Sequence, residues 1–350
     1  MIFASDTWAG VSDKVMAALA AASRHGGPAY GGDQITRRVE ARFNELFERE
    51  VTVFLVGTGT AANTLALAMC ARPGGVILCH SEAHILVDEA GASEALGSRV
   101  LGIEGRHGKI APEAIAAALE RFQPDHVHTG QPVAVSITEV TELGAAYSPA
   151  EIAAIAAVAH GRGLPLHVDG ARFAGALAAL NVSPADLTWR AGVDMMSFGA
   201  TKNGCLASEA VVFFDRARAA DFVFARQRAG HGFSKAWFLA AQMEAYLADS
   251  LWLDNAHHAN AMAARLADVI RKSGTARLAL EPAANEVFVI LPQALDGHLR
   301  AAGVVYGPWS AASFPPAERP RAGEVLVRMV TTFATTAAEI DRFAAVLRGG

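Results

Sequence analysis

Apolar positions along this chain follow two different patterns, which predict two kinds of element. Short runs rich in Val, Ile, Leu and Phe predict buried strands, whereas longer runs in which apolar residues recur every three or four positions predict helices. Between residues 51 and 215 the two kinds of run alternate. The runs that predict strands cover residues 51–56, 75–80, 133–138 and 164–169, and two more lie within residues 194–214. This alternation predicts an α/β fold, a largely parallel sheet with helices on both faces.

The pattern changes after residue 215. Helical periodicity dominates up to about residue 272, and strand-like runs return beyond residue 277. We therefore expect a second, smaller α/β domain at the C-terminal end. The expected division is an N-terminal segment with the large domain at residues 1–250 and the small domain at residues 251–350.

The composition is typical of a globular protein and argues against several classes of partner. Hydrophobic residues make up 52% of the 350 residues and charged residues 19%, which allows one large core or a large domain with a smaller one. The net charge is −5 with no basic run, which argues against a nucleic acid partner. No apolar run approaches the roughly 20 residues that a membrane-spanning helix requires, and we expect no signal peptide. The three cysteines, an odd number, are expected to be reduced thiols of a cytoplasmic protein.

A polar loop separates the two strand-like runs of residues 194–214, and it contains Lys202. A lysine in a loop is usually a solvated surface charge. This chain, however, has only five lysines against 25 arginines, and Lys202 is flanked by Gly199, Thr201 and Gly204, which let a ligand or another backbone approach closely. A lysine held between strand ends and partly desolvated can lose its proton and attack a carbonyl carbon.

A second polar position, Asp169, ends an apolar run upstream of that loop. The run predicts a buried strand that leads into Gly170 and Arg172. A carboxylate at the carboxyl end of a parallel strand points into the crevice where open α/β sheets bind ligands. Pyridoxal 5′-phosphate (PLP) needs a lysine for its Schiff base and an acid that keeps its pyridine nitrogen protonated. Asp169 and Lys202 together therefore favour a PLP enzyme.

The turn Gly-Thr-Gly-Thr at residues 57–60 lies between a predicted strand and a predicted helix. This layout presents free backbone N–H groups and the positive end of a helix to an anion, although such turns also occur without a ligand. The turn lacks the Gly-Lys-Ser/Thr end of a Walker loop and the full dinucleotide fingerprint. Thr58, Gly59 and Thr60 are therefore candidates for binding a phosphate group.

Histidines offer candidates for proton transfer. Residues 82–96 are expected to form a helix on which His84 and Asp88 share a face, four residues apart. His84 follows the strand after the phosphate candidate, so the loops at the strand ends can bring it to the same crevice. His126 and His128 lie close in sequence, but no third ligand at a recognised spacing accompanies them, so we expect no metal site.

Two further segments contain candidates for substrate binding. Tyr30 lies in a glycine-rich loop at residues 26–32, which is either a plain connector or a loop that covers a site. Residues 324–333 alternate in polarity, and Arg328 shares a face with Glu324. Arg328 is therefore either a solvent-facing strand residue or a clamp for a substrate carboxylate, for which the bidentate geometry of arginine is suited.

Short motifs along nearly the whole chain resemble those of the low-specificity L-threonine aldolases. That family has the aspartate aminotransferase-like fold of PLP enzymes (fold type I), with a mainly parallel seven-stranded sheet, helices on both faces and a small C-terminal α/β domain. No single motif is decisive, but their shared order and spacing are specific. The motifs are Ser5-Asp6-Thr7, Tyr30-Gly31, Thr-Gly-Thr-Ala-Ala-Asn at 58–63, Ala83-His84-Ile85, His-Val-Asp-Gly-Ala-Arg at 167–172, Ser-Phe-Gly-Ala-Thr-Lys-Asn-Gly at 197–204 and Val-Arg-Met-Val-Thr at 327–331.

The resemblance implies how the cofactor would be held. Lys202 would form the Schiff base with PLP, Asp169 would pair with the pyridine nitrogen, and His84 would stack over the ring. The turn at residues 58–60 would hold the phosphate group.

The resemblance also implies how the substrate would be held. Arg172, beside the cofactor, and Arg328 would bind the substrate carboxylate, with Ser5 next to them. Family members are dimers paired into tetramers, so Tyr30 would reach the site from a neighbouring subunit. Lys235 would contact a phosphate group across the same interface.

The loop at residues 140–144 departs from the pattern of many family members, which carry a histidine there, near the substrate hydroxyl. This chain has Glu142 at that place, in the Thr-Glu-Leu-Gly form of one branch of the family. In that branch the missing loop histidine is replaced by a histidine just before the strand that precedes the loop, and His128 lies at this position. The base for the hydroxyl proton is then His84, His128 or an ordered water, and the histidine pKa near 6.5 suits this task.

The resemblance implies a carbon–carbon lyase that cleaves L-threonine, L-allo-threonine or a related β-hydroxy-α-amino acid such as phenylserine to glycine and an aldehyde. Alternatives remain open. A β-eliminating lyase or an aminotransferase would use the same fold and the same lysine. A nicotinamide oxidoreductase would use the glycine turn with Glu82 but leave Lys202 and Asp169 without a role. A protein of this fold without catalysis would have no reason to keep Lys202.

Overall fold

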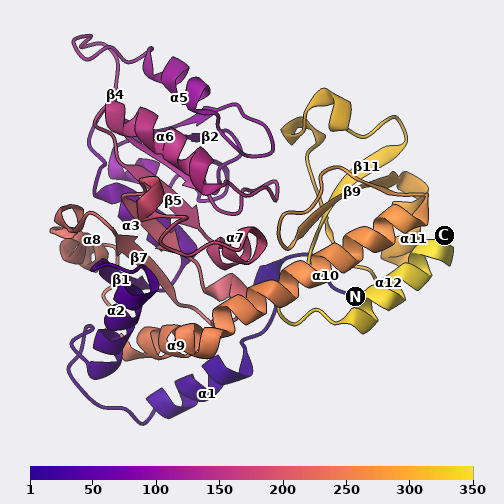
Figure 1. Ribbon diagram of the computed structural model, residues 1–350, viewed down its shortest axis with the longest axis horizontal. Coiled ribbons are helices and arrows are strands. Elements are labelled where there is room, and N and C mark those ends of the chain that lie inside the picture. Colours follow the sequence, from indigo (N-terminus) through magenta and orange to yellow (C-terminus); the bar gives the residue numbers. More distant parts are fainter. Residues whose placement is uncertain (350) are drawn as a thin grey trace.

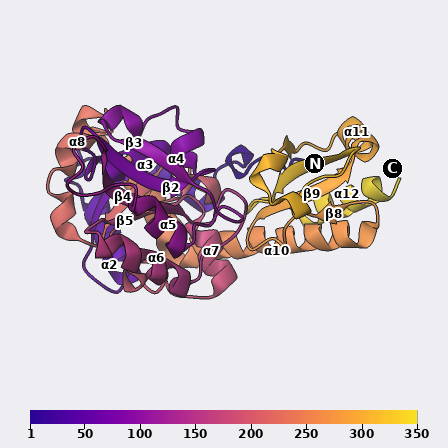
Figure 2. The same cartoon turned by 90° about the horizontal axis from the view of Figure 1, so that it is seen from above.

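The chain folds around two β-sheets in two lobes that are joined by one long helix (Figure 1, Figure 2). The computed structural model describes residues 1–349. The larger sheet has the strand order β1-β7-β6-β5-β4-β2-β3, in which β7 is antiparallel to both neighbours and the other pairs are parallel. Its strands are β1 (Thr52–Val56), β2 (Gly75–His80), β3 (Arg99–Ile103), β4 (Gln131–Thr138), β5 (Leu166–Gly170), β6 (Met195–Phe198) and β7 (Glu209–Phe213). The expected fold, a mainly parallel seven-stranded sheet, is confirmed.

Helices cover both faces of the larger sheet, because its strands are apolar on both sides. One face is covered by α1 (Asp13–Ala22), α2 (Gln34–Leu46), α5 (Pro112–Leu119), α6 (Pro149–Gly161), α7 (Phe173–Leu180) and α9 (Trp237–Leu247), and the other by α3 (Gly59–Ala68), α4 (His84–Val87) and α8 (Phe222–Arg228). Successive residues of a strand enter different cores: Val76 and Leu78 belong to the first, Ile77 and Cys79 to the second.

The smaller sheet is antiparallel, in the order β10-β11-β9-β8. Its strands are β8 (Arg277–Leu278), β9 (Glu286–Pro292), β10 (Gly307–Pro308) and β11 (Glu324–Val330). One of its faces is covered by α10 (Leu251–Ser273), α11 (Gln293–Ala301) and α12 (Ala337–Gly349). Phe3, near the start of the chain, packs into the same core, and Ile2 forms a β-bridge with Val305.

The other face of the smaller sheet packs against the larger lobe. Phe288, Ile290, Phe314 and Leu326 form a buried apolar cluster with Leu143, which belongs to the segment after β4. The loop that follows β4 is therefore fixed between the two lobes.

The long helix α10 connects the lobes, with contacts to α7 in the larger lobe and to α12 in the smaller one (Figure 1). It is separated from α9 by Asp249 and Ser250, which have left-handed backbone angles (φ 49° and 58°). This break falls within the predicted helical run. None of the helices in residues 1–349 is both long and apolar enough to cross a membrane.

One local prediction is wrong. The helix expected at residues 82–96 is reduced to the four residues of α4. Ala90 and Gly91 follow with left-handed angles (φ 51° and 73°), which end helical structure. His84 and Asp88 therefore do not share the face of a continuous helix.

Candidate active site

A cavity of about 390 Å³ lies at the carboxyl edge of the parallel strands of the larger sheet. This is the edge at which α/β sheets bind ligands. The cavity is lined by many of the residues that the sequence singles out, namely Thr58, Gly59, Thr60, His84, Asp169, Arg172 and Lys202. The remaining candidates lie outside its lining, namely Ser5, Tyr30, His128, Lys235 and Arg328.

The turn between β1 and α3 forms one wall of the cavity. Thr58 caps α3, because its Oγ1 accepts a hydrogen bond of 3.1 Å from the N–H of Ala61. The N–H groups of Gly59 and Thr60 have no acceptor within residues 1–349, as expected for the first turn of a helix. A Cβ atom on Gly59 would meet no atom within 4 Å, so this side of the turn is open. Free N–H groups at the positive end of a ten-residue helix suit a phosphate group.

Lys202 lies in a single 3-10 turn, η4 (Thr201–Asn203), between β6 and β7. The next side chain fixes this turn: Nδ2 of Asn203 donates to the hydroxyl of Tyr246 and to the carbonyl of Trp252, both at 2.7 Å. These two hydrogen bonds hold the turn that carries Lys202 in place at the edge of the sheet.

The glycines around Lys202 are required by close packing. A Cβ on Gly199 would lie 2.5 Å from the carbonyl oxygen of Ala171, and Gly204 has a φ of 127° that favours glycine. The close approach of another backbone, expected from the small residues, is confirmed.

Asp169 is the fourth residue of β5 and is buried. Its Oδ1 accepts a hydrogen bond of 3.0 Å from the N–H of Ala171, and its Oδ2 accepts one of 2.7 Å from Nδ2 of Asn63. These two donors orient the carboxylate and leave further lone pairs on both oxygens. Such a carboxylate can accept a hydrogen bond from a protonated ring nitrogen.

His84 is linked to Asp169 by a chain of hydrogen bonds that sequence reasoning missed. Nδ1 of His84 lies 2.9 Å from Oε1 of Glu89, which accepts a hydrogen bond of 2.8 Å from Nδ2 of Asn63, and this amide also donates to Asp169. The hydrogen bond to Glu89 raises the pKa of His84, while burial opposes it. Asn63 is the last residue of the Thr-Gly-Thr-Ala-Ala-Asn motif at residues 58–63. Glu89 directly follows Asp88, the acid that was expected to share a helical face with His84.

The ligand atoms of His84, Glu89 and Asp169 also lie within 4.8 Å of one another, a spacing that a metal ion could use. The amide of Asn63 already donates to both carboxylates, however. This neutral donor engages one oxygen of each carboxylate, while Oε2 of Glu89 is buried without a partner within residues 1–349.

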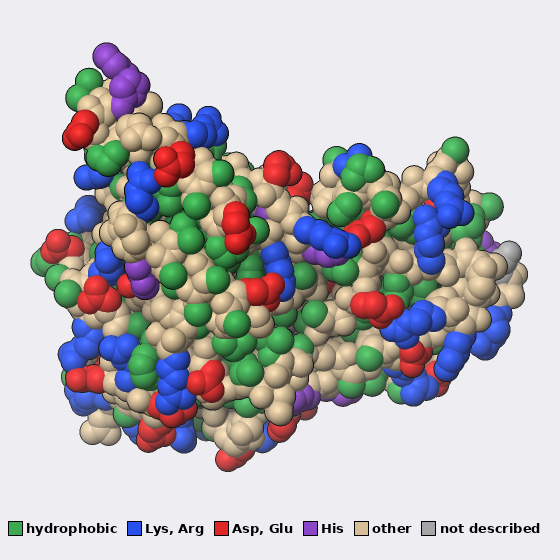
Figure 3. Space-filling model, turned by 45° about the horizontal axis from the view of Figure 1, so that its top comes forward, with side chains coloured by type: hydrophobic (Ala, Val, Ile, Leu, Met, Phe, Trp, Pro, Cys, Tyr) green, Lys and Arg blue, Asp and Glu red, His purple; other side chains and the backbone are tan. Residues whose placement is uncertain are grey.

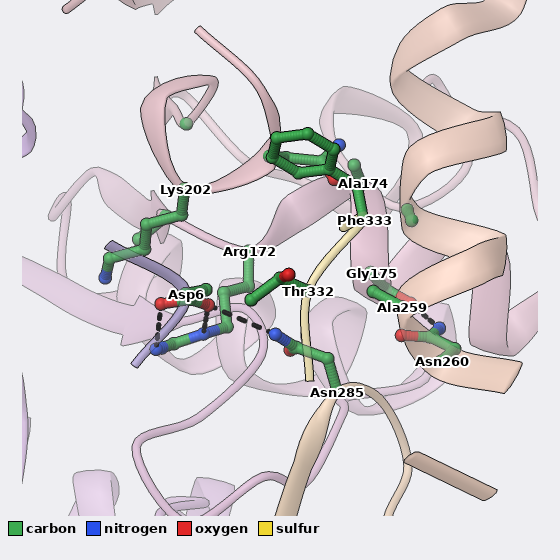
Figure 4. A pocket seen from close by; sticks show the side chains of 14 residues that line it. Asp6, Arg172, Ala174, Gly175, Lys202, Ala259, Asn260, Asn285, Thr332 and Phe333 are labelled. Atoms are coloured by element: carbon green, nitrogen blue, oxygen red, sulfur yellow. Dashed lines mark hydrogen bonds and ion pairs between the residues drawn. The ribbon is translucent and has the colours of Figure 1, made fainter. Parts of the chain in front are cut away.

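Arg172 lies within a network of buried charges at the border of the two lobes (Figure 4). Its Nε and Nη2 donate to the two carboxylate oxygens of Asp6 at 2.7 and 3.1 Å, and Nη2 lies 3.4 Å from Glu286. Figure 4 also shows Asn285, whose Nδ2 donates to Asp6 at 3.1 Å. Burial alone would raise the pKa of Asp6, but the charges of Arg172 and Lys202 lower it to about 2. Asp6 is therefore an ionised partner that holds Arg172 in place.

Arg328, on β11, adjoins this network and does not face solvent. Its Nη1 donates to Glu286 at 3.2 Å, and its guanidinium group stacks over the ring of Trp309 at 4.7 Å. Its Nε is buried and has no acceptor within residues 1–349. Burial raises the pKa of Glu286, although Arg172 and Arg328 oppose this effect. The solvent-facing alternative is wrong, and the unused donor of Arg328 suits a carboxylate.

Ser5, Tyr30 and Lys235 lie outside the cavity. Ser5 caps the turn η1 (Asp6–Trp8), and its Oγ lies 2.8 Å from the hydroxyl of Thr7, which lines the cavity in its place. Tyr30 and Lys235 are exposed, on two loops that a hydrogen bond of 3.0 Å joins, from the N–H of Tyr30 to the carbonyl of Ser234.

His128 lies at the wrong end of β4 for a role in the cavity of its own chain. It precedes the strand, whereas the cavity is lined by Thr138 at the other end. The strand has eight residues, each of which advances the chain by about 3.3 Å. The rings of His126 and His128 lie 5.4 Å apart, exposed at the tip of a projecting loop, where Figure 3 shows histidine side chains in purple. His128 therefore does not line the cavity of its own chain, and its role as a base stays a prediction.

The residues of the cavity fit PLP. A helix N-terminus with two free N–H groups can take the phosphate, a buried carboxylate can take the ring nitrogen, and Lys202 supplies the amine. Arg172 lines this cavity, and Arg328 is joined to it through Glu286; guanidinium groups of this kind suit a second, smaller anion such as an amino acid carboxylate.

Comparisons with known proteins agree with this site. The family model described as beta-eliminating lyase matches residues 3–294. The low-specificity L-threonine aldolase of Pseudomonas aeruginosa is 42% identical over 304 residues, which are 86% of this chain and 87% of that protein. The solved threonine aldolase of Leishmania major has a TM-score of 0.92 at 29% identity, over 99% of this chain and 98% of that one. A serine palmitoyltransferase of Sphingomonas wittichii, 18% identical with a TM-score of 0.71 over 100% of this chain and 86% of that one, shares the fold. The chain therefore belongs to the beta-eliminating lyase family and, within it, to the low-specificity L-threonine aldolases.

Proposed function

We propose that this protein is a PLP-dependent carbon–carbon lyase that cleaves L-threonine, L-allo-threonine or a related β-hydroxy-α-amino acid such as phenylserine to glycine and an aldehyde. The observation that carries the proposal is the meeting of Lys202, Asp169, His84 and the turn at residues 58–60 in one cavity. Two relatives at 42% and 40% identity that are named low-specificity L-threonine aldolases support the same reaction.

Each wall of the cavity has a role in holding the cofactor. Lys202 holds PLP covalently through Nζ, and the N–H groups of Gly59 and Thr60, with Thr58 at the cap, bind its phosphate group. Asp169 keeps a proton on the ring nitrogen. When bound, PLP supplies an aldehyde that condenses with an amino group and a protonated ring that accepts the electron pair released at Cα. His84 covers the ring and is itself oriented by Glu89.

Arg172 and Arg328 orient the substrate through its carboxylate, with Ser5 beside them. The network supports this role because Asp6 and Glu286 fix both guanidinium groups before substrate arrives. Preorganised arginine donors bind a carboxylate without losing much side-chain entropy.

Replacement of Arg328 by alanine is expected to raise KM for L-threonine and to change kcat much less. Loss of one charge-assisted contact costs about 1.5–3 kcal/mol, which corresponds to a rise in KM of about 10- to 100-fold. Steady-state kinetics with L-threonine measure both constants. Arg277→Ala is the matched control on the same sheet, since Arg277 pairs with Glu324 away from the cavity, and its KM should stay unchanged. An unchanged KM in Arg328→Ala would exclude the clamp.

The assembly that we infer is a homotetramer, a dimer of dimers, in which Tyr30, Lys235 and His128 of neighbouring copies complete each site. Exposed apolar side chains around the cavity support this assembly. Leu206 lines the cavity and is 56% exposed, and Trp8 is 64% exposed beside the cavity residue Thr7. Apolar surface of this kind at the mouth of a site suits a subunit interface.

The remaining assignments follow the same reasoning. The boundary between the large and the small domain lies at residues 250 and 251, which the left-handed break before α10 supports.

The cysteines Cys70, Cys79 and Cys205 form no disulfide within residues 1–349, which supports a reducing, cytoplasmic location. The partner is a small amino acid, with no role for nucleic acid or membrane.

The reaction is tested by incubating the purified, PLP-loaded protein with L-threonine, L-allo-threonine and phenylserine. We expect glycine and the matching aldehyde in equal amounts, measured by amino acid analysis and by reduction of the aldehyde with a coupled dehydrogenase. L-Serine and L-alanine with a keto acid acceptor serve as comparison substrates. Pyruvate and ammonia from L-serine without any aldehyde from the first three substrates would indicate a β-eliminating lyase. A new keto acid from L-alanine would indicate an aminotransferase.

A further inference from the structure

Glu142 is a carboxyl group in the wall of the cavity for which the binding roles above give no use. It lines the cavity together with His84 and Thr138. Its Oε1 accepts two hydrogen bonds of 2.8 Å, one from the backbone N–H of His84 and one from the hydroxyl of Thr138. Its Oε2 is shielded from solvent and has no partner within residues 1–349. One oxygen of this carboxyl group therefore keeps its full capacity to accept a proton.

The position of Glu142 is fixed by its neighbours in the chain. Leu143 is buried in the apolar cluster of the smaller sheet. Gly144 has a φ of 76°, which favours glycine, and a Cβ there would lie only 3.3 Å from the ring of Phe288. On the other side, Thr141 donates from Oγ1 to the carbonyl of His107 at 2.8 Å. The loop is therefore held by both lobes, and Glu142 is presented to the cavity without freedom to move away.

The charges around Glu142 come from several elements. Asp169 of β5 raises the pKa of Glu142, and the charge of Glu142 in turn acts on Arg172 at the start of α7, on Cys79 of β2 and on Tyr147 before α6. Burial is the largest influence and raises the pKa of Glu142 to about 7, while the N–H of His84 and the hydroxyl of Thr138 oppose it. A carboxyl group with a pKa near 7 can both take and return a proton at neutral pH.

We propose that Glu142 is the catalytic base that takes the proton of the substrate β-hydroxyl during cleavage. The inference rests on the proposed aldol reaction. The hydroxyl O–H bond breaks and its proton moves to the carboxylate of Glu142, the Cα–Cβ bond breaks, and the former hydroxyl oxygen becomes the carbonyl oxygen of the aldehyde. The electron pair of the broken bond stays with Cα, which then takes one proton to give glycine. In the direction of synthesis Glu142 returns its proton to the new hydroxyl.

The other candidates for this role are less suited. Nδ1 of His84 is already bound to Glu89, and that bond raises the pKa of His84, which favours its protonated form. His128 lies beyond the far end of β4 in its own chain and could reach a site only from a neighbouring copy, whereas Glu142 belongs to the cavity of its own chain. Glu89 also lines the cavity with an unpartnered Oε2, but its Oε1 already orients His84 and Asn63, whereas Glu142 is held in a fixed position and has no such role.

The test is the pH profile of kcat/KM for L-threonine in the PLP-loaded Glu142→Gln variant. The wild-type value should rise as pH increases through about 7, because Glu142 must lose its proton to act as a base, and below this pH the carboxyl group is neutral. Glu142→Gln should lower kcat about 100-fold or more and remove this rise. Glu142→His, which places another side chain that can take and return a proton near neutral pH at this position, should restore a large part of kcat.

Measurements that do not depend on turnover separate a catalytic from a structural role. Glycine has no β-hydroxyl, so Glu142→Gln should bind it with unchanged Kd, followed by the change in visible absorption. In the cofactor-free protein, difference infrared spectroscopy should show a neutral carboxyl band that disappears as pH rises through about 7 and that is missing in Glu142→Gln.

Two further variants complete the design. Glu139→Gln changes another buried glutamate with a raised pKa, which lies outside the cavity lining, and it should leave the pH profile unchanged. Thr138→Val removes one donor to Glu142, so the rise in kcat/KM should move to higher pH. This shift can be measured even where Glu142→Gln does not fold.

The outcomes are distinct. Aldehyde release from none of the substrates by the wild type would overturn the proposed function itself. Cleavage by the wild type with an unchanged pH profile in both Glu142→Gln and Thr138→Val would overturn only the role of Glu142. The role of Glu142 would also be overturned if Glu142→Gln bound glycine more weakly by the same factor by which its kcat fell, since the side chain would then be structural.

Discussion

The Lys202→Ala variant is expected to lose covalent attachment of PLP together with all measurable aldehyde release. No other lysine lines the cavity, so no second amine can replace Nζ. The rest of the site should persist, because the turn around residue 202 is held by the side chain of Asn203 and by Gly199 and Gly204. Reduction of the PLP-loaded protein with borohydride, followed by mass spectrometry, measures attachment, and the aldehyde assay measures activity.

The control for this variant is Lys272→Ala, which removes an exposed lysine near the end of α10, far from the cavity in sequence and outside its lining. Its attachment and activity should equal those of the wild type. Full cleavage of L-threonine by Lys202→Ala would contradict the proposed function, because the amino acid would then be cleaved without the amine that the site provides. Attachment of PLP at another lysine in Lys202→Ala would contradict the placement of the cofactor.

The architecture of the larger lobe follows from patterns that are local in the sequence. Runs that are apolar on both faces, such as residues 75–80, have few alternatives to a buried parallel strand. The edge strand β3 was not predicted, because Arg99 at its start is exposed and Gly102 weakens its apolar run. The short helix α4 was predicted too long, because Ala90 gives no sign in the sequence that it adopts a left-handed angle.

The cofactor-facing candidates could be selected from the sequence because each follows a strand end. Lys202, Asp169 and the turn at residues 58–60 come directly after predicted strands, and the ends of parallel strands meet at one edge. The pairing of Asp6 with Arg172 and of Glu286 with Arg328 could not be predicted in this way. Asp6 and Arg172 lie far apart in the chain and meet only through tertiary packing, whereas Glu286 and Arg328 lie on the neighbouring strands β9 and β11, whose register is not apparent from the sequence.

His128 illustrates a related limit. Its distance in sequence from Glu142 is small, but His128 lies before β4 and Glu142 lies after it. A strand carries its two ends to opposite edges of a sheet, so sequence proximity across a strand implies separation in space. The same reasoning gives Glu142 its place in the cavity, since it follows the strand end.

The Asp169→Asn variant is expected to retain the fold and the covalent attachment of PLP but to lose most activity. Asparagine has nearly the same shape, and its Oδ1 can still accept the hydrogen bond from the N–H of Ala171. It lacks the negative charge that keeps a proton on the ring nitrogen, so the electron pair left at Cα is stabilised less. We expect kcat to fall on the order of 100- to 1000-fold, the loss typical of removing one preorganised electrostatic contact.

Comparison of this variant with Lys202→Ala separates two functions of the site. Asp169→Asn should still show the mass increase after borohydride reduction, whereas Lys202→Ala should not. Asp88→Asn is the matched control, since Asp88 is exposed and lies outside the cavity lining, and its kinetics should equal those of the wild type. A small loss of thermal stability is expected in Asp169→Asn, because Nδ2 of Asn63 would face an amide in place of a carboxylate. Normal turnover in Asp169→Asn would show that the ring nitrogen lies elsewhere, and the cavity would then have to bind PLP in another orientation, with the phosphate group away from the turn before α3.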